Sequence, residues 1–452
     1  MDIDLRDLQS LVAGPPKATI VRHLIFGFDG IEAARIFVRD MTPIVAMADA
    51  GAGSALDAWA NVGFTFRGLA ALGVDPELLE EFDAIYEAGP DGHALGDVPG
   101  SRSDPATWWE GRFRTEDVHC MVQLHSCSDD ALDALTADVR SLAGRGGITE
   151  LVARRDGSVL EGRSLGGGTL HFGYTDGISH PDIRWNDSAG KPGQVDFRMF
   201  VLGYATPEVS SAPRTGPAAE LARGSTYAAF RWMYQDVATF TAFLRAEGPR
   251  LFPDLTPADA EERLAAKLMG RWRDGTPLVT SPDHPDPAQV AANAFGYADQ
   301  DPDGRACPFS AHIRVVNPRD QALDPVVDAV PSVLRRGMPY GAPLAGDEDD
   351  GVDRGILGLF LCADLRRQFY TLTGWIQRND FSPVYNPNRR VQDALVANRA
   401  LSDAVTDFVL PGEGRDGGPA AIRALPDFVH TKGTLFLLYP GRTMLQALAA
   451  AP

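Results

Sequence analysis

The sequence predicts an α+β protein made of two related halves. Its 452 residues exceed the usual size of one hydrophobic core. Strand-like segments followed by amphipathic helices recur along the chain, and a glycine-rich stretch around Asp176 separates two groups of them. We therefore expect an N-terminal half over residues 1–165, a linking loop over 166–195 and a C-terminal half over 196–452.

The first half opens with a strand and a helix. Residues 18–27, "ATIVRHLIFG", are β-branched and alternate as a strand does, and residues 29–50 carry apolar side chains at helical spacing. The same pair returns at 117–126 and 128–144, where Ser128 is typical of a helix N-cap. A further strand is expected at 149–155, which completes a sheet with helices on one face.

The second half repeats the strand and helix pattern. We expect strands at 194–204, 226–235, 355–363 and 433–440, and helices at 236–248 and 364–381. The segments 270–308 and 341–355 are rich in proline and glycine, so they are expected to be ordered loops.

Composition narrows the classes of function. The net charge of −19 and the lack of any basic run argue against nucleic acid and anionic membranes as partners. No apolar run is long enough for a membrane span, and the acidic N-terminus lacks the features of a secretory signal. The four cysteines show no CxxC spacing, which argues against a zinc knuckle or a disulfide framework. We expect a cytoplasmic protein, and both a monomer and a homodimer are compatible with this surface.

Three segments carry residues suited to chemistry. In "HFGYTDGISHP" (171–181), Asp176 is either a turn residue whose side chain caps its own backbone or a carboxylate that points into a functional site. The flanking His171 and His180 lack metal-ligand spacing and are interpreted as loop residues or residues behind a site.

The second segment is "CPFSAHIRVVNPR" (307–319). Its alternation favours a strand, in which His312 and Arg314 share a face, so His312 is either a metal ligand or a hydrogen-bonded core histidine. The third segment, "VLRRGMPYG" (333–341), offers two arginines that are either solvated or directed into a pocket. Taken singly, each segment leaves these alternatives open.

Taken together, in this order and at this separation, the three segments resemble the dye-decolorizing peroxidase family of haem enzymes. Stretches such as "NVGFTFRGLAALG", "LAAKLMGRWRDGTPLVTSPD" and "NAFGYADQDPDG" extend the similarity over most of the chain. The match is closest to the longer-loop branches of the family. The resemblance implies two ferredoxin-like halves with antiparallel sheets and peripheral helices, as in the dimeric α+β barrel-like superfold. It also implies a haem cavity in the C-terminal half, covered by the Gly-x-x-Asp-Gly loop.

The resemblance also implies roles for single residues. His312 is expected to bind the iron of one haem b per chain, with Asp393 in "VQDALVAN" hydrogen-bonded behind it. Asp176 is expected to be the acid and base on the open side of the haem, beside the charge-stabilising Arg335. Arg336 is the alternative to Arg335 if the register differs by one residue.

Four further residues complete the expected haem site. Gly173 and Gly177 are expected to let the backbone pass close to the porphyrin. Phe360 resembles the apolar residue that lines the open side of the haem in this family. An ordinary core residue of a strand is nearly as good an interpretation of Phe360. Arg314 is expected to bind a haem propionate because of its charge and position.

The implied activity is oxidation of dyes, phenols or similar donors by hydrogen peroxide, with heterolytic cleavage of the O–O bond. An aspartate base stays ionised in acid, since aspartate titrates near pH ~3.9, so we expect an acidic optimum. The alternative is a haem carrier, or a protein that releases iron from haem, on the same scaffold. A haem carrier has no need for both Asp176 and Arg335. A third alternative is a chlorite-decomposing enzyme with a related haem fold. It ranks last among the alternatives because such an enzyme does not need Asp176.

Overall fold

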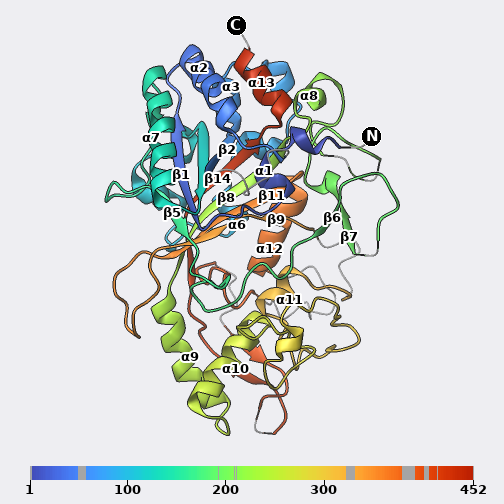
Figure 1. The fold of residues 1–452 in the computed structure, drawn as a ribbon. Helices are drawn as coiled ribbons and strands as arrows, with labels where there is room; N and C mark the ends of the chain where they lie inside the picture. The colour runs from blue at the N-terminus through green and yellow to red at the C-terminus, as the bar shows by residue number, and fades with distance from the viewer. Residues whose placement is uncertain are drawn as a thin grey trace.

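The centre of the molecule is a ten-stranded antiparallel sheet (Figure 1). The computed structural model describes residues 3–48, 57–191, 193–207, 209, 211–321, 331–378, 392–401, 407–414 and 416–450. Across the sheet the strands follow the order β10 (Met338–Tyr340), β11 (Gly355–Cys362), β8 (Thr226–Gln235), β14 (Val429–Tyr439), β2 (Ala58–Phe64), β3 (Cys120–Ser126), β1 (Ile20–Gly27) and β4 (Thr149–Glu150). Off this path, β5 (Leu160–Arg163) pairs with β1 and β9 (Leu334–Arg335) pairs with β11.

Strands from the two predicted halves lie on opposite sides of this sheet. β14 of the C-terminal part meets β2 of the N-terminal part through the register pair Leu438 and Phe64. The mixture of helices and antiparallel strands confirms the α+β class. The sheet is open, but its ends approach one another, because a Cβ on Gly162 of β5 would lie 3.1 Å from the Cβ of Met338 in β10. The boundaries at 165 and 195 stay a prediction.

Helices lie above and below the sheet as Figure 1 is drawn. The upper group contains α2 (Ile31–Met41), α3 (Phe66–Ala71), α7 (Asp129–Gly146) and α13 (Arg442–Ala450), whereas α9 (Val237–Leu251), α10 (Pro257–Met269) and α11 (His312–Val316) form a lower group and α12 (Thr371–Arg378) lies between. Shorter helices are α1 (Ser10–Ala13), α4 (Pro76–Leu79), α5 (Ala84–Ala88), α6 (Gly92–Leu95) and α8 (Gly216–Leu221). Single turns of 3-10 helix are η1 (Leu5–Asp7), η2 (Thr42–Ile44), η5 (Thr115–Asp117), η6 (Phe197–Met199) and η7 (Pro287–Gln289). The segment η4 (Pro105–Gly111) is kinked at Trp108 to Glu110, and η8 (Leu365–Tyr370) is π-helical. Two small sheets pair β6 (Asp182–Arg184) with β7 (Gln194–Asp196) and β12 (Phe408–Leu410) with β13 (Ala420–Ile422).

Capping residues explain where several helices begin and end. The Ser128 hydroxyl accepts a hydrogen bond from the Ala131 amide at the start of α7, and Gly147 ends the helix at φ 68°. Thr256 caps α10 in the same way, and Gly270 closes it at φ 95°. These capping residues therefore determine where α7 and α10 begin and end.

Three predicted elements are wrong in part. The strand expected at 194–204 stops at Asp196, because this side chain accepts a hydrogen bond from the Arg198 amide and starts the turn η6. The strand expected at 149–155 covers only β4. The segment 307–319 forms the helix α11 in place of a strand. No helix in the part of the chain that is described is long and apolar enough to cross a membrane.

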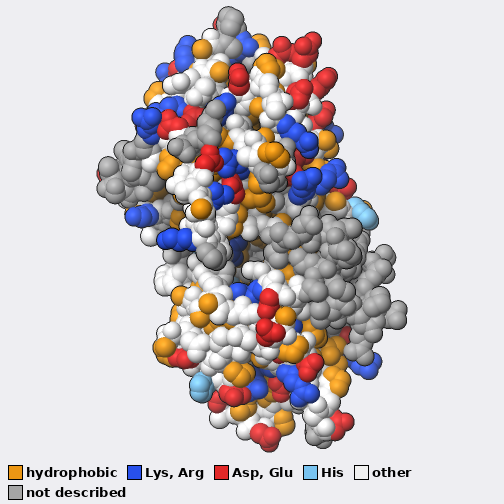
Figure 2. All heavy atoms as spheres, turned by 90° about the vertical axis from the view of Figure 1, so that its right-hand side faces the viewer, with side chains coloured by type: hydrophobic (Ala, Val, Ile, Leu, Met, Phe, Trp, Pro, Cys, Tyr) orange, Lys and Arg blue, Asp and Glu red, His pale blue; other side chains and the backbone are white. Residues whose placement is uncertain are grey.

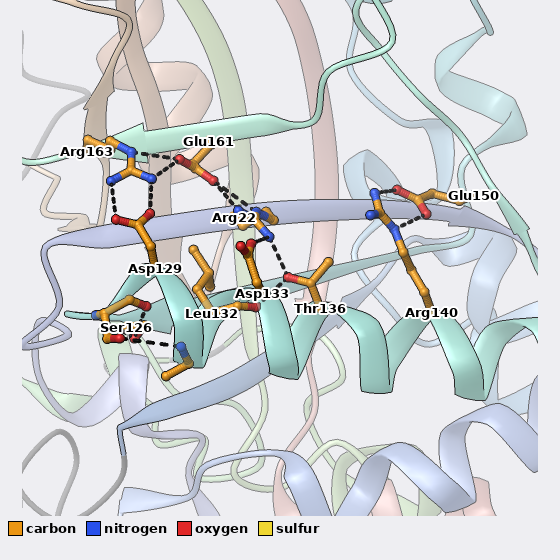
Figure 3. A network of polar contacts seen from close by, with 12 residues as sticks. Arg22, Ser126, Asp129, Leu132, Asp133, Thr136, Arg140, Glu150, Glu161 and Arg163 are labelled. Atoms are coloured by element: carbon orange, nitrogen blue, oxygen red, sulfur yellow. Dashed lines mark hydrogen bonds and ion pairs between the residues drawn. The ribbon is translucent and has the colours of Figure 1, made fainter.

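A network of ion pairs fastens the outer strands to α7 (Figure 3). Arg22 of β1 donates to Glu161 of β5 at 2.7 Å and to Asp133 of α7 at 2.8 Å. Arg163 of β5 pairs with both Glu161 and Asp129, the latter at the start of α7. Because these residues come from three elements far apart in sequence, the network fixes the edge of the sheet against its helix.

A row of polar side chains is buried within the sheet. His23 of β1 lies 3.0 Å from the Gln123 amide nitrogen of β3, and Gln123 in turn accepts from the Tyr439 hydroxyl of β14 at 2.7 Å. His125 stacks on Trp59 with ring centroids 5.5 Å apart, and neither of its ring nitrogens has a hydrogen-bond partner among the residues that the structure describes. Burial, together with the charge of His23, lowers the pKa of His125 to about 3. This imidazole is neutral in the folded protein.

Candidate active site

His312 is the first residue of α11 and is paired with a buried carboxylate. Its Nδ1 lies 2.7 Å from Oδ2 of Asp393, whose side chain is fully buried, while the His312 side chain keeps 25% of its surface exposed. Burial would lower the pKa of His312, but the charge and hydrogen bond of Asp393 outweigh it and raise the pKa. The other ring nitrogen, Nε2, has no hydrogen-bond partner among the described residues. The imidazole therefore offers one free nitrogen to the exposed side.

The backbone around Asp393 holds its carboxylate in place. Oδ1 accepts from the amides of Leu395 at 2.8 Å and Val396 at 2.9 Å, so Oδ2 is left to His312. The amide of Ala394 donates to the Ser310 carbonyl, which ties this segment to the one that carries His312. The orientation of the imidazole is thus fixed by a rigid acceptor.

The loop that carries Asp176 is anchored to the lower helices by aromatic side chains. Phe172 is buried against Phe240 of α9, with ring centroids 4.4 Å apart, and the Tyr174 hydroxyl donates to the Ala265 carbonyl of α10 at 2.7 Å. The Thr175 amide donates to the Arg273 carbonyl at 2.9 Å. These contacts fix the backbone on either side of the acid.

Glycine is required on both sides of Asp176. Gly173 and Gly177 have φ of 88° and 81°, which side chains with a Cβ rarely adopt. A Cβ on Gly173 would also lie 2.9 Å from Nε of Arg273. The loop conformation itself therefore explains these glycines, and the predicted approach to a porphyrin stays a prediction.

Asp176 faces Arg335 across the site. Nη1 of Arg335 lies 3.3 Å from Oδ1 of Asp176, and both side chains are partly exposed. Arg336 points elsewhere: its Nε donates to the Leu11 carbonyl at 2.6 Å, and burial, with the charge of Arg335, lowers its pKa to about 10. Of the two arginines considered from the sequence, Arg335 is the one beside the acid.

The two pairs of residues lie around one space. The charges of Arg335 and Asp176 both act on the pKa of His312, which requires the three side chains to be near one another. Figure 2 shows basic side chains set back between the upper and lower parts of the molecule, next to residues that the structure does not describe. The carboxylate of Asp176 and the guanidinium of Arg335 thus lie within electrostatic range of His312.

Phe360 stands beside Arg335. The two residues are register partners in β11 and β9, so their side chains project from the same face of the sheet. Phe360 is half-buried and packs on Phe369, with ring centroids 5.5 Å apart. Its position is compatible with a wall of the space next to Arg335.

Arg314 lies away from this space. Its side chain is fully buried, with Nη1 2.9 Å from Oδ2 of Asp301 and 2.7 Å from the Cys307 carbonyl, and Nε 2.9 Å from Gln321. In a helix, residues two apart point about 200° apart around the axis, so Arg314 does not share a face with His312 as it would in a strand. The expected shared face is therefore wrong, and the buried network does not favour contact with a propionate.

The two histidines that flank the loop differ in their surroundings. Nε2 of His171 lies 2.8 Å from the Tyr340 carbonyl of β10. His180 lies beside Gly177, and its pKa is lowered by burial and by the charges of Arg335 and Arg336. From the sequence, both were interpreted as loop residues or residues behind a site, and of the two it is His180 that lies beside Gly177.

Comparisons with known proteins agree with this arrangement. The chain is 31% identical over 342 residues to a dye-decolorizing peroxidase of Mycena epipterygia, covering 71% of this chain and 61% of that protein. It is 28% identical over 411 residues to a dye-decolorizing peroxidase of Mycetinis scorodonius, covering 86% of this chain and 76% of that one. The crystallised ancestral D-type dye decolorizing peroxidase superposes with a TM-score of 0.82 at 25% identity, over the full length of both chains. The chain belongs to the dye-decolorizing peroxidase family. No family model matches it.

Membership of the dye-decolorizing peroxidase family implies haem, and the described residues fit it. A neutral imidazole nitrogen without a partner is a suitable axial ligand, and a buried carboxylate behind it is the usual support for such a ligand. Asp176 and Arg335 add a partly exposed carboxylate and guanidinium, which suit contact with a small polar oxidant. The donor set therefore suits a haem iron with one open axial side.

The sequence did not identify the residues that position the loop of this candidate site. Arg273 clamps the loop, since its Nε donates to the Phe172 carbonyl at 3.1 Å and its guanidinium pairs with Glu262 at 2.7 Å. Arg273 and Phe172 lie 101 positions apart in the chain, and no local pattern connects them. Only the folded structure brings them together.

Proposed function

We propose that this protein is a haem peroxidase that uses hydrogen peroxide to oxidise dyes, phenols or similar donors. The proposal is supported by two pairs of residues within electrostatic range of each other: His312 with Asp393, and Asp176 with Arg335. Membership of the dye-decolorizing peroxidase family supports the same activity. The reducing substrate in the proposal is a small aromatic donor.

Asp176 moves the proton in the proposed reaction. Its carboxylate would take the proton from one oxygen of hydrogen peroxide and return it to the other, which leaves as water. The two electrons needed to break the O–O bond would come from the haem, and the dye or phenol would later restore them. The loop anchors at Phe172 and Tyr174 hold the carboxylate at the exposed face where peroxide arrives. A carboxylate also remains a base in acid, which is why we propose an acidic optimum.

Arg335 stabilises negative charge that develops on the departing oxygen. Its guanidinium is permanently charged, and its 3.3 Å contact with Asp176 keeps it beside the acid. Phe360, its neighbour across the strands, presents an apolar wall that would limit water on this side. In the proposal, Asp176 therefore transfers the proton and Arg335 stabilises the negative charge.

His312 and Asp393 hold the cofactor in the proposal. Nε2 of His312 would bind the iron of one haem b, and Asp393 would keep Nδ1 protonated and the ligand electron-rich. Haem supplies the redox chemistry when bound. Gly173 and Gly177 stay in the proposed site as the residues that shape the loop over it.

The test is an absorption spectrum of the purified protein with added haem, before and after one equivalent of hydrogen peroxide. Wild type should show a Soret band that changes on peroxide addition, and His312→Ala should bind haem with a perturbed band. His93→Asn, an exposed position on α6, is the matched control and should behave as wild type. Haem bound through His312 but inert to peroxide would favour a haem carrier, and no haem binding would refute the proposal.

A further inference from the structure

Arg399 lies behind the pair formed by His312 and Asp393. It follows Asp393 by six residues in the described segment 392–401. Its Nη2 donates to the Asp393 carbonyl at 2.7 Å, and its Nη1 donates to Oε1 of Gln392 at 3.2 Å. The guanidinium therefore closes the chain back onto the residue whose carboxylate contacts His312.

Other hydrogen bonds hold both ends of this turn. The Asp393 amide donates to the Ile376 carbonyl of α12 at 3.0 Å, and the Arg399 amide donates to Oδ1 of Asp427 at 2.7 Å. The side-chain amide of Asn398 donates at 2.8 Å to the backbone carbonyl that follows α6. Because these contacts do not use the guanidinium, its removal should change the charge near Asp393 more than the position of the carboxylate.

The charge of Arg399 is not neutralised by a direct ion pair among the described residues. Both acceptors of its guanidinium are uncharged oxygens, and its buried Nε has no hydrogen-bond partner in the same part of the chain. Burial lowers the pKa of Arg399, while the charges of Asp393 and Asp427 act in the opposite direction. A partly buried cation thus lies within electrostatic range of the carboxylate that contacts His312.

We propose that Arg399 acts through Asp393 to make His312 a weaker electron donor, and so raises the reduction potential of the bound haem iron. The inference rests on the proposed binding of haem through His312. A carboxylate that accepts a hydrogen bond from an imidazole makes this ligand more basic, and a cation behind the carboxylate reduces the effect. Arg399 is a positioning residue in this role, since it acts on His312 by way of Asp393.

The experiment is a spectroelectrochemical titration of the purified full-length protein loaded with haem. Arg399→Gln should make the reduction potential more negative by about 59 mV, which is a tenfold change in the equilibrium between ferric and ferrous haem for one electron. Arg399→Lys keeps the charge and should stay close to wild type. Arg423→Gln, which removes an exposed charge directly after β13, is the matched control and should leave the potential unchanged.

Gln392→Glu is a second variant, which leaves Arg399 in place. The new carboxylate can accept from the same Nη1 and neutralise the guanidinium, so the hydrogen bond is kept while the charge is offset. The potential should therefore shift in the same direction as in Arg399→Gln, and this result does not depend on whether Arg399→Gln folds. A purely structural role predicts the reverse pattern, with a shift in Arg399→Lys and none in Gln392→Glu.

Three outcomes would overturn the inference. Equal potentials in wild type, Arg399→Gln and Gln392→Glu would overturn it alone and leave the proposed function standing. A shift in Arg399→Lys as large as that in Arg399→Gln would assign the residue a structural role. A wild-type protein that binds no haem would remove both the inference and the proposed function. Shifted potentials in a haem protein that is inert to peroxide would instead support the inference and refute the peroxidase.

Discussion

Replacing His125 by phenylalanine is expected to make the protein more resistant to acid. Both ring nitrogens of His125 are buried without a hydrogen-bond partner, and the ring stacks on Trp59 at 5.5 Å with an interplanar angle of 18°. Phenylalanine keeps the stacked ring and loses no hydrogen bond. It also removes the only part of the side chain that takes up a proton.

The size of the effect follows from the pKa of His125. The pKa is about 3 in the folded protein, against an ordinary value of 6.5. Stability from the neutral imidazole is therefore complete above pH 6.5 and is lost as the pH falls from 6.5 toward 3, because only the unfolded chain takes up the proton. At pH 5 this loss reaches about 2 kcal/mol, at 1.36 kcal/mol for each pH unit below 6.5.

The assay is urea unfolding of wild type and His125→Phe at pH 7.5 and at pH 5. The difference between the two proteins in free energy of unfolding should change by about 2 kcal/mol in favour of the variant on acidification. All other groups, His23 included, titrate in both proteins and cancel in this comparison. His93→Asn, an exposed histidine, should show no such change. If His125→Phe loses as much stability in acid as wild type does, His125 is not a buried neutral group.

The remaining predictions concern the proposed peroxidase site. Asp176→Asn should lower turnover by roughly 10²- to 10⁴-fold while haem stays bound, and should abolish the acidic optimum, as a pH series of dye oxidation would show. An unaltered pH profile in this variant would assign the base to another residue. Arg335→Leu should slow the reaction with peroxide by roughly 10²- to 10³-fold in stopped-flow measurements, whereas Arg336→Leu should not, because Arg336 is turned toward the Leu11 carbonyl. Asp393→Asn should reduce haem affinity or activity by roughly ten- to a hundredfold and make the reduction potential more positive; a potential equal to wild type would contradict its role behind His312.

Local patterns in the sequence predicted most of the strands and helices. The alternating apolar residues of 226–235 and 355–363 became the adjacent strands β8 and β11, and the capping residue Ser128 began α7 as expected. These elements were predictable because their caps and faces lie within a few residues of one another. The segment 307–319 was not, because its alternation suits a strand while the structure turns it into a short helix.

Resemblance to a family suggested roles for His312, Asp393, Asp176 and Arg335, and the structure places them in two contacting pairs within electrostatic range of each other. The roles stay a prediction. What the sequence could not supply was orientation. The direction of Arg314 depended on the wrong local conformation, and the choice between Arg335 and its neighbour depended on register in β9. The clamp of Arg273 on the loop depends on contacts between distant segments, which no local pattern encodes.

The two sides of the proposed site are built from separate segments of chain. The acid and the cation come from the loop before β6 and from β9, whereas the histidine and its carboxylate come from α11 and the segment after α12. For protein engineering of the proposed peroxidase, this division means that the acid and cation can be varied in one library and the histidine and its carboxylate in another. The hydrogen bonds of each pair are made within its own segments, whereas the charges of Asp176 and Arg335 reach His312, so variants from the two libraries must be assayed in combination.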